Sequence, residues 1–253
     1  MDRTVTLVNW LTTAAMSVGI VAFGLATRRA ANEYAKQSLV TLFFVPLIAT
    51  SLYLMMAMGQ GTTTVEDGRQ VTWIRYVTWF TTTPLLLNQI ARVVHAPPSA
   101  ALSLVLADLF MIATGGLADL SPMPQRGVWY AVSSLAFVFI LRVLVVDLGR
   151  AATRVPDDVR RLYRTLLVVN VVTWVAYPVV WILGSAGLRL FGNGMQALLF
   201  ALLDWTSKVG FGLVILARRP ALERSGALAD ALAAVPSAPP VTQPRSQPAP
   251  RPG

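Results

Sequence analysis

Seven apolar runs in this chain are each long enough to cross a lipid bilayer as one helix. They cover residues 5–27, 38–60, 73–95, 99–119, 128–148, 162–186 and 194–217. A helix needs about 20 residues to span the hydrocarbon core of a membrane. Of the 253 residues, 55% are hydrophobic and only 13% are charged, which is too apolar for an ordinary soluble domain. The sequence therefore predicts an all-α membrane protein, a bundle of seven transmembrane helices in a lipid bilayer.

Composition also excludes several classes of site. The chain has no cysteine and a single histidine, so neither thiolate metal sites nor histidine clusters are available, and we expect no metal. Its net charge of +9 comes from arginines at the ends of apolar runs, not from a basic stripe with interleaved aromatic residues. We therefore expect a membrane topology signal and no nucleic-acid partner.

The Lys and Arg residues near the ends of the runs predict the orientation of the bundle. On the side of the N-terminus the chain carries only Arg3, Arg69, Arg126 and Arg189. The opposite side carries Arg28, Arg29, Lys36, Arg92, Arg150, Arg154, Arg160, Arg161, Arg164, Arg218, Arg219 and Arg224. Positive residues concentrate in cytoplasmic loops. We therefore expect a multi-pass protein of the cell membrane with an extracellular N-terminus and a cytoplasmic C-terminus.

Two segments outside the runs have a recognisable composition. Residues 59–70, GQGTTTVEDGRQ, contain a β-prone threonine stretch and an Asp-Gly pair, which favour a short β-hairpin across the extracellular side, although a plain loop is nearly as compatible. Residues 1–219 are expected to form the seven-helix domain. Residues 220–253 are expected to form a cytoplasmic Pro-rich tail that is disordered from about residue 236.

The seventh run contains the strongest chemical signal. Asp204 and Lys208 are four residues apart and therefore lie one turn apart on the same helix face. A charged side chain in the middle of a bilayer costs about 3 kcal/mol on insertion scales, so such residues are usually functional. A structural ion pair is one interpretation. The other is chemistry at the lysine, since a buried lysine amine is suited to Schiff-base formation with an aldehyde.

The third and sixth runs supply further groups for an internal site. Arg75, Thr78 and Thr82 share one face of the third run, which cannot face lipid. Intramembrane threonines often bond only to their own helix, but the neighbouring arginine favours a polar site here. In the sixth run, aromatic residues and a helix-bending proline recur at helical spacing: Trp174, Tyr177, Pro178 and Trp181. Together with Trp79, these rings would enclose a flat apolar ligand.

The segments RYVTWFTTTPLLL, WVAYPVVW and LDWTSKVGFG resemble the third, sixth and seventh helices of the microbial rhodopsins, the family of bacteriorhodopsin and halorhodopsin. The likeness extends over residues 5–219 and implies all-trans retinal as the cofactor, held as a protonated Schiff base by Lys208, with Asp204 as counter-ion. It also implies that Arg75 lies on the extracellular side of the Schiff base and that Tyr53 lies near Asp204. The retinal pocket implied by the family is Trp79, Thr83, Leu86, Met111, Phe137, Trp174, Tyr177, Pro178, Trp181 and Ser207.

The chain departs from the proton pumps of this family at the positions that carry protons. Where those pumps have an acceptor aspartate on the third helix, this chain has Thr78, and where they have a carboxylic donor it has Gln89. Ala186 and Gln196 replace the carboxylates of their extracellular release group. None of these four side chains can bind and release a proton near neutral pH.

The missing carboxylate changes the charge of the site. A protonated Schiff base, Arg75 and Asp204 sum to +1, which an anion would neutralise. One ion pairing at about 4 Å and an effective dielectric of about 20 is worth roughly 4 kcal/mol before desolvation. Thr78 and Thr82 can donate hydroxyl hydrogens to that anion, and a threonine at the position of Thr78 resembles the chloride-pumping halorhodopsins. The predicted function is a light-driven inward pump for chloride or another monovalent anion, which is a transporter and not an enzyme with catalytic residues.

Three other functions would use the same retinal pocket, and a fourth would need no retinal. A photosensory rhodopsin would signal through a partner surface, an outward proton pump would need other proton carriers, and a light-gated anion channel would need a continuous polar pathway. A seven-helix receptor without retinal leaves Lys208, Asp204 and the aromatic residues unexplained. Asp108 is expected to be protonated and hydrogen-bonded near the retinal ring. Family members often form trimers, and small-residue helix faces are compatible with a homo-oligomer of this kind.

Overall fold

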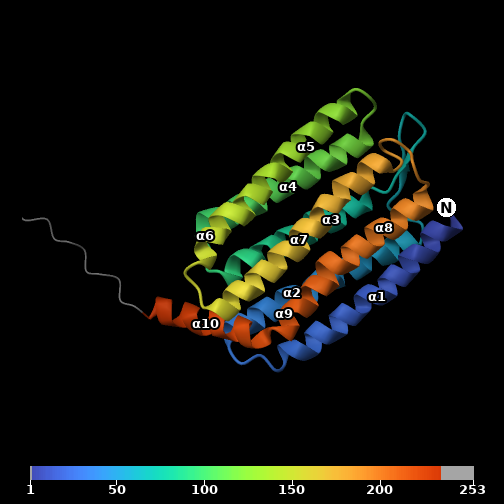
Figure 1. The fold of residues 1–253 in the computed structure, drawn as a ribbon. Helices are drawn as coiled ribbons and strands as arrows, with labels where there is room; N and C mark the ends of the chain where they lie inside the picture. The colour runs from blue at the N-terminus through green and yellow to red at the C-terminus, as the bar shows by residue number, and fades with distance from the viewer. Residues whose placement is uncertain (1, 235–253) are drawn as a thin grey trace, which may run out of the picture.

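Seven long helical rods run side by side in the computed structural model, which describes residues 2–234 (Figure 1). Five are continuous α-helices: α1 (Arg3–Thr27), α2 (Glu33–Ala57), α3 (Ile74–Val93), α4 (Pro98–Leu120) and α7 (Asp157–Leu183). The fifth rod joins α5 (Gln125–Arg142) to α6 (Leu148–Ala152) through the π-helical segment η1 (Val143–Asp147). The last joins α8 (Asn193–Trp205) to α9 (Phe211–Ala217) through a second π-helical segment, η2 (Thr206–Gly210).

Six of these rods are long and apolar enough to cross a membrane. The remaining rod, α3, has 20 residues but carries a polar face that includes Arg75 and Thr78, both buried. Large apolar side chains project outward from the bundle, as on α1, where Leu7, Leu11 and Val18 are each more than half exposed. Because exposed apolar patches of this extent suit lipid and not water, the bundle is built for a membrane.

Helix ends differ from the boundaries that the apolar runs predicted. Helix α2 begins at Glu33 and not at residue 38, because the Asn32 side chain accepts a 2.8 Å hydrogen bond from the Ala35 amide and caps the helix. Helix α7 begins at Asp157 and not at residue 162, with two acidic residues in its first turn. These polar first turns extend the helices beyond their apolar stretches, so hydropathy alone could not locate them.

The expected β-hairpin between the second and third rods is confirmed. Strand β1 (Thr63–Thr64) pairs antiparallel with β2 (Gln70–Val71), with Thr63 opposite Val71. Gly68 has a φ of +79°, a left-handed conformation that glycine adopts without strain. We call the end of the bundle that carries this hairpin the hairpin end.

At the opposite end, the chain continues into an additional helix, α10 (Arg219–Ala233), which lies across the ends of the rods (Figure 1). The sequence placed these residues in a Pro-rich tail, but the tail begins with a helix whose Ala221 and Leu222 are buried against the bundle. The part from about residue 236, expected to be disordered, lies outside the described residues. We call this end of the bundle the α10 end.

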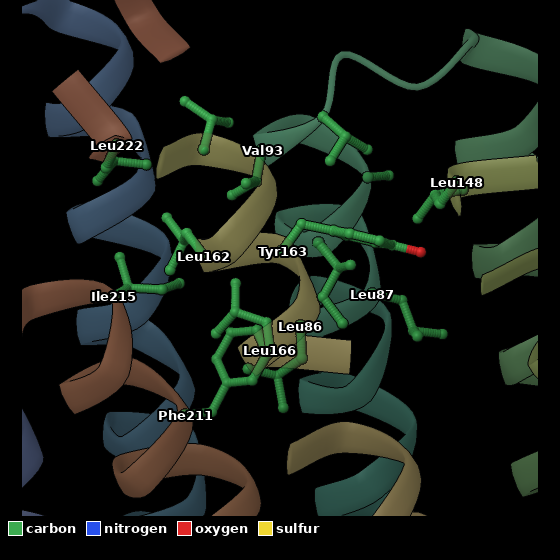
Figure 2. Close-up of a cluster of buried hydrophobic side chains, with 14 of the residues drawn as sticks. Leu86, Leu87, Val93, Leu148, Leu162, Tyr163, Leu166, Phe211, Ile215 and Leu222 are labelled. Carbon is green, nitrogen blue, oxygen red and sulfur yellow. The ribbon is translucent and has the colours of Figure 1, made fainter. Parts of the chain in front are cut away.

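Buried apolar side chains fill the bundle between its centre and the α10 end (Figure 2). We define the apolar plug as Leu86, Leu162, Leu166, Phe211 and Ile215, all of which are fully buried. Three rods supply these residues, namely α3, α7 and the rod that ends in α9. Close-packed apolar side chains of this kind oppose the passage of water and ions.

Candidate functional site

The buried carboxylate of Asp204 is the centre of the site, and four rods converge on it. Lys208, one turn further along the same rod, forms an ion pair with it, and both side chains are completely buried. Tyr53 of α2 donates a 2.5 Å hydrogen bond to Oδ2. Trp79 Nε1 of α3 and the Tyr177 hydroxyl of α7 donate to Oδ1 at 2.9 and 2.7 Å. Hydrogen bonds to a charged acceptor are stronger than those between neutral groups, so these donors fix the carboxylate in one position.

Lys208 lies in the π-helical segment η2 and not in a regular α-helix. Such widened turns are frequently found at functional sites, because they change the direction of the side chains that follow. The spacing of the pair is i, i+4, as the sequence predicted. Tyr53 beside Asp204 is also as expected.

A cavity of about 240 Å³ is lined by Trp79 and Tyr177, two of the residues that donate hydrogen bonds to Asp204. Eight of the predicted pocket residues line it: Trp79, Thr83, Met111, Phe137, Trp174, Tyr177, Pro178 and Trp181. Two others do not, because Leu86 belongs to the apolar plug and Ser207 lies behind the Tyr177 hydroxyl, at 3.1 Å from it. The cavity also has walls that the sequence analysis did not name: Tyr76, Ile112, Gly115, Tyr130, Ser133, Ser134, Val138 and Phe200.

Flat aromatic side chains shape this cavity. Trp79 and Tyr177 meet edge to face, with ring centroids 5.1 Å apart, and Tyr130 stacks on Trp181 at 4.8 Å. The Trp181 indole is held by a 3.1 Å hydrogen bond to the Tyr76 hydroxyl. Rings fixed in this way leave a flat apolar space whose one end reaches the hydrogen-bond partners of Asp204.

The hydroxyl groups on the polar face of α3 bond to their own helix. The Thr78 hydroxyl donates to the Ile74 carbonyl at 3.1 Å, and the Thr82 hydroxyl donates to the Thr78 carbonyl at 2.6 Å. Neither residue lines a described cavity. Arg75 lies over the Phe200 ring, 4.7 Å from its centroid, and borders a second cavity of about 270 Å³ at the hairpin end.

The sequence did not predict a cluster of ion pairs at the hairpin end. Arg69 pairs with Asp67 at 2.9 Å and with Asp119 at 3.0 Å, and Arg126 pairs with Asp67. The Tyr76 hydroxyl, which also accepts from Trp181, donates to Asp119 at 3.1 Å. We call Asp67, Arg69, Asp119 and Arg126 the outer ion cluster. Its residues lie in the hairpin, α4 and α5, and no local sequence pattern connects them.

The other residues singled out in the sequence have defined surroundings. Asp108 accepts a 2.7 Å hydrogen bond from Thr83, a cavity residue, as expected for a group close to the ligand space. Ala186 offers its carbonyl to Arg126 at 3.2 Å, and Gln196 accepts from Ser185 at 3.0 Å. Trp205, next to Asp204 in the chain, points away from the site: it is 36% exposed and donates to the Ala15 carbonyl of α1 at 3.3 Å.

Comparison with known proteins agrees with this architecture. The model of the family described as "Bacteriorhodopsin-like protein" matches residues 3–221. The chain belongs to the bacteriorhodopsin-like family. Bacteriorhodopsin of Halobacterium salinarum is 38% identical to it over 216 residues, which are 83% of this chain and 82% of that protein. Bacteriorhodopsin-I of Haloquadratum walsbyi is 39% identical over 189 residues, which are 73% and 74% of the two chains.

Solved structures of other rhodopsins have the same fold. The thermophilic rhodopsin from Rubrobacter xylanophilus superposes with a TM-score of 0.85 at 34% identity, covering 88% of this chain and 99% of that one. A cyanorhodopsin from Calothrix sp. superposes with a TM-score of 0.85 at 30% identity, covering 89% and 99%. The protein is therefore a microbial rhodopsin, a multi-pass membrane protein of a family that binds retinal.

The site fits that cofactor. A bacteriorhodopsin-like protein needs a flat apolar space that ends at a buried amine, and here the cavity residues Trp79 and Tyr177 bond to the same carboxylate oxygen as Lys208. The amine is completely buried and paired, so it is shielded from bulk water. Of the described residues, Lys208 is the only lysine inside the bundle, since Lys36 lies at the α10 end.

Proposed function

We propose that this rhodopsin is a light-driven inward pump for chloride or another monovalent anion. The observation that carries the proposal is the shortage of negative charge around Lys208. In residues 2–234, Asp204 is the single carboxylate that pairs with Lys208, and Arg75, which is buried, forms no ion pair. Two buried positive groups thus share one buried negative group. Such an imbalance in a low-dielectric interior attracts an anion.

The outer ion cluster does not correct this imbalance. Its two arginines and two aspartates pair with one another, so the cluster is neutral as a whole. Arg75, which forms no ion pair within residues 2–234, borders a cavity whose walls include the neutral side chains of Asn9, Ser185 and Gln196 and the carboxylates of Asp2 and Asp119, the latter already paired with Arg69. Two charges about 4 Å apart at an effective dielectric of about 20 interact by roughly 4 kcal/mol. A halide that enters from the hairpin end would gain a stabilisation of that order before desolvation.

Each side chain has a role in this proposal. Lys208 would hold retinal as a protonated Schiff base, Asp204 would keep that group charged, and the aromatic walls would confine the polyene. Bound retinal supplies light absorption and a light-driven change of shape. Thr78 and Thr82 have no carboxylate and cannot accept a proton near neutral pH, so the positive charge stays at Lys208. Their hydroxyl hydrogens would turn from the helix carbonyls to an anion placed between Arg75 and Lys208.

The proposal includes a topology. We infer that all seven rods cross the membrane, that the hairpin end is extracellular and that the α10 end is cytoplasmic. Arg28, Arg29, Arg92, Arg218 and Arg219 lie at the α10 end, in agreement with the preference of positive residues for the cytoplasm. Residues 1–219 would then form the retinal-binding domain. We also propose that the protein forms a homo-oligomer such as a trimer.

An outward proton pump is the second candidate, and the similarity to bacteriorhodopsin of Halobacterium salinarum favours it, because proteins of that name pump protons outward. Asp204 would then have to accept the proton from Lys208 directly, since the two are in contact. Against this stands Gln89, an amide without proton-carrying capacity at the position of the cytoplasmic donor. The two candidates predict opposite ion movements.

Chloride titration and ion-flux measurement test the proposal. In the retinal-bound protein, chloride added in place of sulfate should shift the visible absorption, because an anion beside Lys208 alters the charge around the chromophore. Illuminated cells should alkalinise a chloride medium, more strongly with a protonophore, because protons follow the anion inward. A spectrum that chloride does not change would refute the anion pump, and acidification that a protonophore abolishes would establish proton export instead.

A further inference from the structure

Two amide side chains are buried without partners in the half of the bundle that ends at α10. Gln89 on α3 and Asn170 on α7 are each 1% exposed. Both polar atoms of the Gln89 amide and the Asn170 nitrogen lack a hydrogen-bond partner among the described residues. An unpaired buried amide destabilises a fold, and an apolar side chain of similar size would remove that cost. The unpaired amides therefore indicate a function in a state of the protein other than this one.

Both amides lie beside residues of the apolar plug. On α7, Asn170 is one turn from Leu166 and one turn from the cavity residue Trp174, so it is on the cavity side of the plug. On α3, Gln89 lies between Leu86 and Val93, so it is closer to the α10 end than Leu86. Leu86 and Leu166 belong to the same cluster of buried side chains (Figure 2). On α7, the plug residues Leu166 and Leu162 lie one and two turns from Asn170 toward the α10 end, so the line from the cavity to α10 passes the amides before it leaves the plug.

Helix α10 closes this line. Leu222 is completely buried in the same cluster as Val93, Leu162 and Ile215 (Figure 2). Ser225 fastens the helix, because its hydroxyl donates to the Val93 carbonyl at 3.1 Å.

Contacts with the start of α2 hold α10 from a second side. The Asn32 amide donates to the Glu223 carbonyl at 2.9 Å. A Cβ at Gly226 would lie 2.7 Å from Asn32 Oδ1, so the close approach of α10 to this segment requires glycine. Docking of α10 is therefore specific and not a loose association.

We propose that the transported anion leaves between α3 and α7, with Asn170 and then Gln89 as hydrogen-bond donors, and that α10 is the gate of this exit. The identity of the ion rests on the proposed function. Neutral amide N–H groups suit an anion, because they donate to it without trapping it as a buried arginine would. In the resting protein the plug and Leu222 separate the two amides from the cytoplasm. Opening needs α10 to lift at Ser225, which frees the Val93 carbonyl and exposes the plug to water.

Asn170→Leu and Gln89→Leu test the exit route in the full-length, retinal-bound protein. Each should raise the thermal denaturation midpoint or leave it unchanged, because an unpaired amide is removed. Each should also slow the chloride-dependent return to the dark spectrum after a flash by about tenfold, the equivalent of about 1.4 kcal/mol. Val168→Leu, on the outward face of α7, is the matched control and should recover at the wild-type rate.

Ser225→Ala tests the gate. Losing the bond to Val93 should speed amide exchange in α10 and shorten the same recovery severalfold, whereas Asp230→Ala, on the exposed surface of α10, should change neither. The exit route is wrong if the chloride-induced shift of the dark spectrum is intact and both leucine variants recover at the wild-type rate. The gate is wrong if Ser225→Ala frees α10 without altering recovery. A wild-type dark spectrum insensitive to chloride would instead refute the proposed function.

Discussion

The indole Nε1 of Trp79 on α3 donates a 2.9 Å hydrogen bond to Asp204 Oδ1 on α8. This bond joins a wall of the cavity to the carboxylate that neutralises Lys208. The position of the ring and the position of the charge are therefore set together. Tyr53 and Tyr177 add bonds from two more rods, so loss of the carboxylate would disturb the whole centre of the bundle.

Asp204→Asn should destabilise the protein strongly. The substitution leaves the completely buried Lys208 without its partner, and removal of one partner of a buried ion pair costs about 3–5 kcal/mol. Thermal denaturation followed by loss of visible absorption measures the effect. Asp230→Asn, on the exposed face of α10, is the control and should melt with the wild type. Equal melting of Asp204→Asn and the wild type would show that Lys208 has another counter-ion.

Thr78→Asp should remove the need for chloride. A carboxylate at this position of α3 supplies the missing negative charge, so an anion would meet repulsion where it now meets a net positive site. The chloride affinity, read from the visible spectrum, should fall more than about tenfold, since even half of the Coulomb energy estimated above exceeds the 1.36 kcal/mol of one decade. Thr78→Ser keeps the hydroxyl and should keep the affinity. Chloride dependence that survives in Thr78→Asp would place the anion elsewhere.

Much of the fold was predictable, because it depends on local sequence. Apolar runs of about 20 residues have few structures open to them other than membrane helices. The Asp204–Lys208 pair follows from helical spacing alone, and the hairpin follows from its threonines and its Asp-Gly turn. In each case the residues that interact are close together in the chain.

The unpredicted features are contacts between distant segments. Arg69 reaches Asp119 across 50 positions, so no periodicity marks this contact, whereas the proximity of Tyr53 to Asp204, across 151 positions, was expected only from the family resemblance. Helix α10 was missed for a related reason, because its burial depends on the fit of Leu222 and Ser225 to other helices. The hydroxyls of Thr78 and Thr82 bond to their own helix, which is one of the two interpretations that the sequence left open.

Asp67→Asn should loosen the β-hairpin. Its carboxylate bonds to Arg69 and Arg126, and these two arginines hold the pKa of Asp67 well below its usual range. The stabilisation from such a group is complete above the unfolded pKa of about 3.9 and is lost only as pH falls through the lower folded pKa. Hairpin amide exchange in the wild type, corrected for its intrinsic pH dependence, should thus be constant from neutral pH down to about pH 4.

The same exchange measurement separates the ion pairs from the turn itself. In Asp67→Asn the amides of β1 and β2 should exchange severalfold faster at neutral pH, because Arg126 loses its partner from the hairpin. Glu66→Gln is the matched control, since Glu66 is one position away and forms no ion pair in residues 2–234. If both variants exchange at the wild-type rate, the outer ion cluster does not hold the hairpin.

Docking of α10 should weaken in mild acid through His95. Burial lowers the pKa of His95, contact with the Ser225 carbonyl raises it, and Arg92 lowers it again, with a net decrease. The ring also faces Tyr34, and its Nε2 lies 3.0 Å from the Ser225 carbonyl oxygen. A lowered pKa means that the docked state favours the neutral ring. Its contribution is complete above the undocked pKa of about 6.5 and is lost as pH falls through the docked value.

Amide exchange of α10, corrected for the intrinsic pH effect, should therefore be faster at about pH 5.5 than at about pH 7.5. His95→Asn removes the titrating ring, and asparagine tolerates the left-handed backbone at this position, where φ is +50°. In that variant the corrected exchange rate should be the same at both pH values. A variant that retains the acid-induced loosening would assign it to a group other than His95, and a wild type without loosening would show that protonation does not act on α10.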